Sequence, residues 1–218
     1  MKYILLTPYN TSNMMLTKSI FPLLYAAPIS YYAQYLKKTG SIEKMENFTK
    51  QNFRTRCRIY GANGVINLSI PVVANSNKTL INQVEISNID SWQRNHWKTL
   101  ESAYKSSPFF EFYSHLIKPL YEKKFTHLWD FNLSFHLVIL KCLEVKTPPV
   151  FTSEFTSIQP EDLRVIYSSK KAHPSSPLFP VYQQVFSYQK EFEPDLSILD
   201  GIFNLGPELE NYLLKLPV

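Results

Sequence analysis

Apolar and polar side chains alternate most regularly in two neighbouring stretches, Phe53–Ile59 and Val65–Val73. Alternation with a period of two is typical of a β-strand that buries one face. The turn between the stretches contains Asn63-Gly64, and Asn-Gly is the strongest short signal for a hairpin. The pattern therefore predicts an early antiparallel hairpin. One face of that hairpin would carry three arginines: Arg54, Arg56 and Arg58.

Much of the remaining chain shows the period of a helix. Pro28 suits a first helical turn because it lacks an N–H, and apolar residues then recur from Ile29 to Leu36 at helical spacing. Lys37, Lys38 and Gly40 would close this helix. Further helices are predicted over residues 91–103, 109–123, 128–143, 196–203 and 209–216, and short strands over 42–48, 81–86 and 150–155.

Strands come early in this order, helices follow, and one more strand comes after the helical block. The order predicts the α/β class, with a mixed β-sheet, an early antiparallel hairpin and packed helices in a single domain. That domain would span residues 19–218. Residues 1–18, which include the apolar segment Tyr3–Leu6, would form an N-terminal extension or an extra strand.

Glycine is scarce, with 5 residues in 218, where average usage would give about 15. No two of them have the spacing of a dinucleotide fingerprint or a Walker A loop, which excludes glycine-rich phosphate loops. The five histidines form no HxxxH or HExxH motif, so we expect no metal site and no cofactor. Any bound anion should then be held by side chains.

The longest apolar stretch, Ile20–Ile29, contains two prolines and falls well short of the roughly 20 residues that a membrane-spanning helix needs. The apolar segment at the N-terminus is too short for the core of a signal peptide. Cys57 and Cys142 have no CxxC partner, which is typical of reduced thiols. We therefore expect a cytoplasmic protein with no transmembrane segment, and its oligomeric state stays open.

Charge is unevenly distributed along the chain. Residues 1–150 carry 18 Lys and Arg against 9 Asp and Glu, whereas residues 151–218 carry 5 against 9. The excess of cations in the first part favours a polar or anionic ligand, and the arginine row could bind one through planar bidentate contacts. The alternative is an exposed basic face with salt bridges to Glu43 or Glu46. Nucleic acid is not expected, because the basic stretch is short and the chain ends acidic.

The densest group of chemically active side chains lies within Trp92–Tyr104. His96 could act as a general base near neutral pH. Trp97 and Glu101 lie four residues apart and share a helix face, with Tyr104 one turn further on. The alternative for His96 is a packed, hydrogen-bonded core residue.

Two further groups are candidates for a site. Asp130 and Asn132 follow His127 at a helix start, where helix capping by Asp130 is the alternative explanation. Asp200 and Asn204 lie four apart and could point into one cavity, or they could belong to a polar helix face.

Several blocks of the chain, in this order, resemble the WbqC-like protein family, and the match begins at about Phe21. The strongest block is Trp92–Tyr113, which ends Ser106-Ser107-Pro108-Phe109-Phe110-Glu111-Phe112-Tyr113. The others are Pro28–Ala33, Asn52–Ile59 with Gly61-Ala62-Asn63-Gly64, Ile70-Pro71-Val72, Tyr121–Lys124, Tyr182–Phe186, Pro194–Asp200 and Phe203–Pro207. Residues 19–218 would then be a WbqC-like domain. Some members of this bacterial family lie in O-antigen gene clusters and have been suggested to be transferases, with glycine suggested as a transferred group.

The resemblance implies a transferase of O-antigen or surface-polysaccharide biosynthesis that acts on a small-molecule or carrier-linked anionic substrate. His96 would accept a proton, and Glu101 or Asp130 would orient the reacting group. The residues predicted to bind substrate are Arg54, Arg56, Asn63, Trp97, Tyr104, Asn132, Asp200 and Asn204. The alternative is a non-catalytic ligand-binding or scaffolding protein. A nucleotidyltransferase-like enzyme without a glycine loop is a third hypothesis.

Overall fold

The computed structural model describes residues 18–73, 76, 78–158, 162–168, 179–188 and 191–217. The predicted N-terminal extension, apart from Lys18, lies outside these residues. The elements are β1 (Ser19–Phe21), α1 (Ile29–Lys37), β2 (Gly40–Ile42), β3 (Arg56–Gly61), β4 (Gly64–Ser69), η1 (Ile81–Gln83), α2 (Trp92–Tyr104), α3 (Phe110–Glu122), α4 (Leu128–Cys142), α5 (Leu163–Ile166), α6 (Ile198–Leu205), η2 (Gly206–Glu208) and α7 (Leu209–Lys215).

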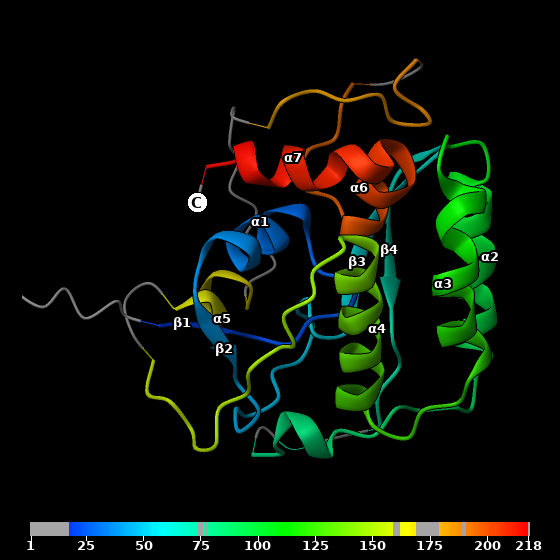
Figure 1. Cartoon of the computed structure of the whole chain (residues 1–218). Helices are drawn as coiled ribbons and strands as arrows, with labels where there is room; N and C mark the ends of the chain where they lie inside the picture. Colours follow the sequence, from blue (N-terminus) through cyan, green and yellow to red (C-terminus); the bar gives the residue numbers. More distant parts are fainter. Residues whose placement is uncertain are drawn as a thin grey trace, which may run out of the picture.

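Helix α4 is central, and its sequence explains this position. It is apolar around most of its circumference, and its buried side chains include Trp129, Phe131 and Phe135. In Figure 1, α2 and α3 lie side by side on one flank of α4, while α1 and α7 pack against each other on the other side. Aromatic side chains from these helices fill a continuous core.

The strands form two small sheets. β1 and β2 pair in parallel, with Ser19 opposite Gly40, and Ile42 also forms a parallel bridge to Phe151. β3 and β4 form the predicted antiparallel hairpin. The α/β class is thus confirmed. Among the described residues, the mixed sheet consists of one parallel and one antiparallel pair of strands.

Two glycines hold positions that another residue would not fit. Gly64 has φ 112° in the hairpin turn, as the Asn-Gly signal predicts. Gly40 was predicted to close α1, and that role is wrong: Lys38 caps the helix in an extended conformation, and Gly40 begins β2. A Cβ on Gly40 would lie 2.2 Å from the Ser19 carbonyl oxygen, so the close approach of β1 requires glycine.

Three predicted strands differ from the structure. In the 42–48 segment only Ile42 belongs to β2, and Asn47 forms an isolated bridge to Leu80. The 81–86 segment begins as the 3-10 helix η1, and strand character is limited to bridges at Glu85 and Ile86. Its buried side chains are Ile81, Val84 and Ile86. The first two are three residues apart, which suits a helical turn packed on α4, whereas Val84 and Ile86 alternate around the exposed Glu85 where the bridges form. In the 150–155 segment only Phe151 forms a β-bridge.

Candidate functional site

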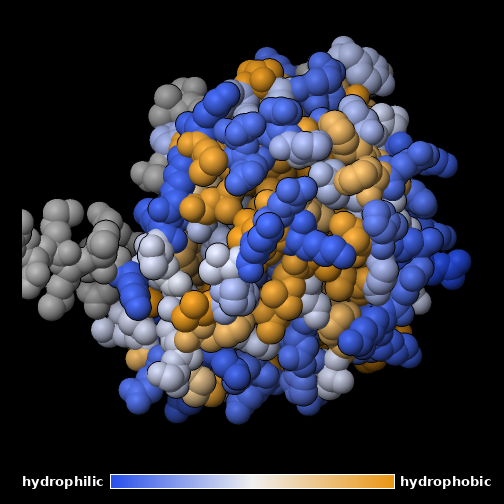
Figure 2. Space-filling model, viewed as in Figure 1, coloured by the Kyte–Doolittle hydropathy of each residue, from blue (hydrophilic) through white to orange (hydrophobic). Residues whose placement is uncertain are grey.

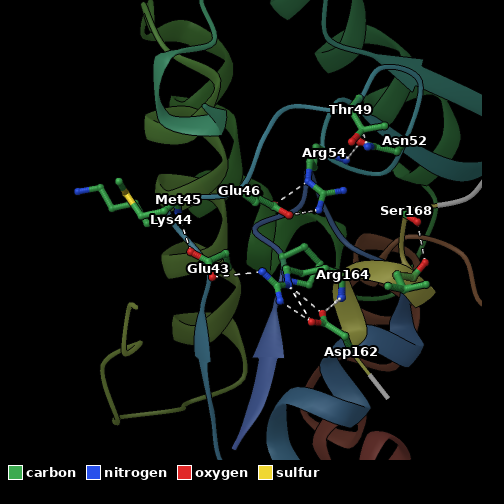
Figure 3. A network of polar contacts seen from close by, with 12 residues as sticks. Glu43, Lys44, Met45, Glu46, Thr49, Asn52, Arg54, Asp162, Arg164 and Ser168 are labelled. Carbon is green, nitrogen blue, oxygen red and sulfur yellow. Dashed lines mark hydrogen bonds and ion pairs between the residues drawn. The ribbon is translucent and has the colours of Figure 1, made fainter. Parts of the chain in front are cut away.

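Arg54 is buried and paired, which contradicts its predicted place on an exposed arginine face. Its Nε donates to Glu46 Oε1 at 2.8 Å, and its Nη2 donates to Glu46 Oε2 at 2.5 Å (Figure 3). Only 2 % of Arg54 is exposed. The reason is local: the Asn52 side chain accepts the Arg54 N–H in a turn, and β3 begins only at Arg56. Alternation of side chains therefore does not extend back to Arg54.

A second buried ion pair lies beside the first and was not predicted. Arg164 donates three guanidinium hydrogen bonds to Asp162, two from Nε and one from Nη2, and its Nη1 lies 3.2 Å from Glu43 Oε2 (Figure 3). The Thr156 carbonyl accepts a further bond from Arg164 at 2.7 Å. This cluster joins α5 to β2. No local pattern could have revealed it, because Glu43 and Arg164 are far apart in sequence.

The exposed face of the β3–β4 hairpin carries a compact set of polar groups, which we call the hairpin face: Arg56, Arg58, Asn67 and Ser69. Arg56 lies opposite Ser69, and Arg58 opposite Asn67, so the four side chains are neighbours. Arg58 Nη2 pairs with Glu193 Oε1 at 2.5 Å. Among the described residues no carboxylate pairs with Arg56, which leaves its guanidinium able to contact a ligand.

His96 lies on the buried side of the hairpin, where it meets the backbone of Ser69. Its Nδ1 is 2.9 Å from the Tyr25 hydroxyl, and it also hydrogen-bonds to the Ser69 backbone. Burial lowers the pKa of His96 to about 4, only partly offset by the bond to Ser69. The imidazole is therefore neutral near pH 7 and serves as a hydrogen-bond partner in the core.

The other predicted residues are dispersed. Glu101 and Asn63 are exposed. Asp130 is exposed in the first turn of α4, where its carboxylate is 3.7 Å from His127 Nδ1 and makes no capping hydrogen bond. Trp97 packs on aromatic rings of α3, and the buried Asn132 donates to the Arg54 carbonyl at 2.8 Å. No contact joins His96 to Glu101 or Asp130 among the described interactions.

Three predicted residues do meet, at a buried carboxylate. Asp200 Oδ2 accepts bonds from the Tyr182 hydroxyl at 2.5 Å and from Gln184 Nε2 at 3.0 Å. Tyr104 adjoins the same carboxylate, and Asn204 donates to the Asp200 carbonyl at 2.8 Å. Burial raises the pKa of Asp200, although these hydrogen bonds lower it in part. We call this group the Asp200 centre.

The Asp200 centre and the hairpin face are connected. Gln184 donates its Nε2 to the Glu193 carbonyl and accepts the Glu193 N–H, at 2.9 and 3.0 Å. The Glu193 side chain in turn pairs with Arg58. Hydrogen bonds of Gln184 and the ion pair of Glu193 thus tie a buried acid to the exposed hairpin face.

The family model of the WbqC-like protein family matches residues 32–176. The chain belongs to the WbqC-like protein family. No curated protein and no solved structure matches it.

The hairpin face, His96 and both buried ion pairs formed by Arg54 and Arg164 lie within the part of this WbqC-like chain that the family model matches. Asp200, Tyr182 and Glu193 lie beyond it. Within the described residues, no helix has the length and apolar character to cross a membrane, and no three His, Cys, Asp or Glu side chains are grouped as metal ligands.

Replacing Asp200 tests whether its carboxyl carries an unfavourable charge. Because the pKa is raised in the folded state, wild-type stability should fall as the pH rises from 3.8 through the raised value. Asp200→Asn accepts the same hydrogen bonds without a charge, so we expect it to be at least as stable as wild type at pH 7. Asp200→Ala should lose about 1–3 kcal/mol, because Tyr182 and Gln184 lose their acceptor. Urea denaturation measures both; equal losses in the two variants would contradict this account.

Proposed function

We propose that this WbqC-like protein is a transferase of O-antigen or surface-polysaccharide biosynthesis that acts on an anionic substrate, supplied either as a small molecule or on a carrier. Family membership supports the proposal, and so does the excess of cations in the first 150 residues. The observation that carries it is the hairpin face. There, an arginine with no carboxylate partner among the described residues lies beside a second arginine, an amide and a hydroxyl.

The hairpin face suits a phosphate or carboxylate group. Arg56 can offer a planar pair of donors, and Ser69 and Asn67 add neutral donors directly across the strand pair. Arg58 already holds a carboxylate, that of Glu193, at 2.5 Å. A substrate anion would take over or share this position, so Glu193 marks where a negative group fits.

The catalytic roles stay predictions. His96 meets the Ser69 backbone from the buried side of the hairpin, so it lies across the strand pair from the hairpin face. Its pKa of about 4 makes it a weak base, so a proton-accepting role requires the bound substrate to raise that value. An anion on Arg56 would act in this direction, because a nearby negative charge favours the imidazolium.

Arg56→Gln is expected to weaken donor binding at least about ten-fold, because a charge-assisted contact is lost. Isothermal titration of the full chain with nucleotide-sugars and with aminoacyl donors measures this. The matched control is Arg94→Gln, which makes the same change of charge at an exposed position on α2. Binding that is unchanged in Arg56→Gln, or absent for every donor, would contradict the proposal.

Glu193→Gln provides the opposite test on the same face. Removing the carboxylate frees Arg58 and takes one negative charge away from the hairpin face, so anion binding should tighten. Weaker binding in this variant would show instead that Glu193 contacts the substrate or orders the segment that does.

The alternative is a non-catalytic ligand-binding or scaffolding protein. The observation that favours it is the dispersal of the predicted catalytic set: His96 is buried and bonded to Tyr25, whereas Glu101 and Asp130 are exposed. Product analysis after incubation with donor and acceptor mixtures distinguishes the two functions. Donor binding without turnover in every mixture would favour the binding protein.

A further inference from the structure

Exposed apolar side chains are concentrated along one part of the chain. They belong to the end of α4 and the irregular segment after it, and we call them the 137–158 surface. The members and their exposed fractions are Leu137 46 %, Val150 59 %, Phe151 38 %, Phe155 56 % and Ile158 64 %. Single exposed apolar residues are ordinary, but a concentration of this kind indicates a surface that contacts a membrane or a protein partner.

Two hollows lie in the part of the 137–158 surface between Leu137 and Val150. One hollow of about 410 Å³ lies between Leu137 on α4 and the loop at 144–149. A second, of about 340 Å³, lies on the other side of that loop and extends to Val150 and the end of α1. Both share Val145 and Pro148 as walls. Figure 2 shows apolar side chains gathered on this face of the molecule around protruding polar ones.

Cations outnumber anions around these apolar groups. Lys38 and Lys146 line the hollows, Lys141 lies in the last turn of α4, and the backbone of Lys44 contacts Thr152. Two exposed carboxylates lie within this stretch of the chain: Glu144, which lines one hollow, and Glu154. The C-termini of α1 and α4 also end here, and each carries about half a negative charge. The four lysines exceed the two carboxylates and the two helix ends by about one charge, so the region is weakly positive.

We propose that the 137–158 surface docks the protein on an anionic lipid bilayer. Apolar side chains that protrude separately from an irregular loop, with long lysine side chains around them, can enter the interfacial region, where no matching protein shape is required. The lysines would face acidic headgroups, and the hollows would accept the ends of lipid chains. The biological role of this docking rests on the proposed function, because a carrier-linked substrate would be presented at such a surface.

Vesicle co-sedimentation with the full chain tests the docking directly. Vesicles of phosphatidylcholine with phosphatidylglycerol should bind the protein, vesicles of phosphatidylcholine alone should bind it weakly, and salt should reduce binding to the former. Val150→Ser/Ile158→Ser should lower binding at least ten-fold. Lys141→Gln/Lys146→Gln should lower it about five-fold for each lysine removed.

The matched control is Ile89→Ser/Val181→Ser, which makes the same two changes at positions exposed by 93 % and 78 % outside this surface. It should bind vesicles like wild type. Absence of vesicle binding, or equal loss in the control, would overturn the proposal. So would self-association that Val150→Ser/Ile158→Ser abolishes without any vesicle binding, because the surface would then be a protein interface. Donor titration in solution is independent of these results, so the proposed function and the docking can fail separately.

Discussion

Arg54→Met is expected to lower the free energy of unfolding by about 3–5 kcal/mol, because it leaves the Glu46 carboxylate buried without its counterion. Only 6 % of Glu46 is exposed, and both of its oxygens accept from Arg54. Chemical denaturation with urea measures the loss. The same experiment on Arg56→Gln should show a change of no more than about 0.5 kcal/mol, because that side chain is on the surface of the hairpin.

The double variant Arg54→Met/Glu46→Leu separates the ion pair from the packing around it. Removing both charges leaves no uncompensated carboxylate, so the double variant should be more stable than Arg54→Met alone. A loss below about 1 kcal/mol in Arg54→Met, combined with weaker donor binding, would show that Arg54 binds substrate as the sequence suggested. A large loss with donor binding retained in the folded fraction would confirm a structural role.

Local patterns were sufficient for the hairpin and the main helices. Between Arg56 and Ser69, alternation on both sides of Asn63-Gly64 specifies the strands, the turn and their faces without knowledge of distant residues. The boundaries of α2, α3 and α4 follow from apolar residues at helical spacing, because each helix has one side against the same core.

Long-range pairing could not be predicted in the same way. The parallel pair β1–β2 and the bridge from Ile42 to Phe151 join segments that carry no mutual signal in sequence. Arg54 shows a related failure, since a turn at Asn52 reverses the face on which the alternating pattern would place it. Ion pairing with Glu46 was an alternative in the sequence, but only the fold decides between the two.

The candidate site was predictable only in part. The spacing of Asp200 and Asn204 correctly places them one turn apart on a helix, and Tyr104 meets them from α2. The donors to Asp200 come from Tyr182 and Gln184 in an irregular segment, where no period relates side chains to a direction in space. The link from that segment through Glu193 to Arg58 is visible only in three dimensions.

Acidification should destabilise the protein through two buried histidines. Burial lowers the pKa of His96 to about 4 and that of His136 to about 3, from an ordinary value of 6.5. Below pH 6.5 the unfolded chain takes up protons that the folded chain refuses, so the free energy of unfolding falls with decreasing pH. Between pH 6.5 and 4.5 the two histidines together should remove about 4 kcal/mol.

The double variant His136→Phe/Tyr32→Phe isolates one of the two contributions. Among the described residues, the Nδ1 of His136 bonds to the Tyr32 hydroxyl alone, at 3.1 Å, and its Nε2 has no partner, so replacing both side chains leaves no broken pair. The variant should lose about 2 kcal/mol less than wild type over the same pH range.

Urea denaturation at a series of pH values measures how much less unfolding free energy the variant loses than wild type. Asp200 acts in the opposite direction, because its raised pKa makes the folded chain bind a proton first, and its contribution is common to wild type and variant. His115→Gln is the control, since it removes an exposed histidine on α3 and should leave the pH dependence as in wild type. A pH dependence that is the same in the His136 variant as in wild type would mean that His136 is protonated within the folded core. Its single bond to Tyr32 and its unpaired Nε2 would then have to rearrange to hold the charge.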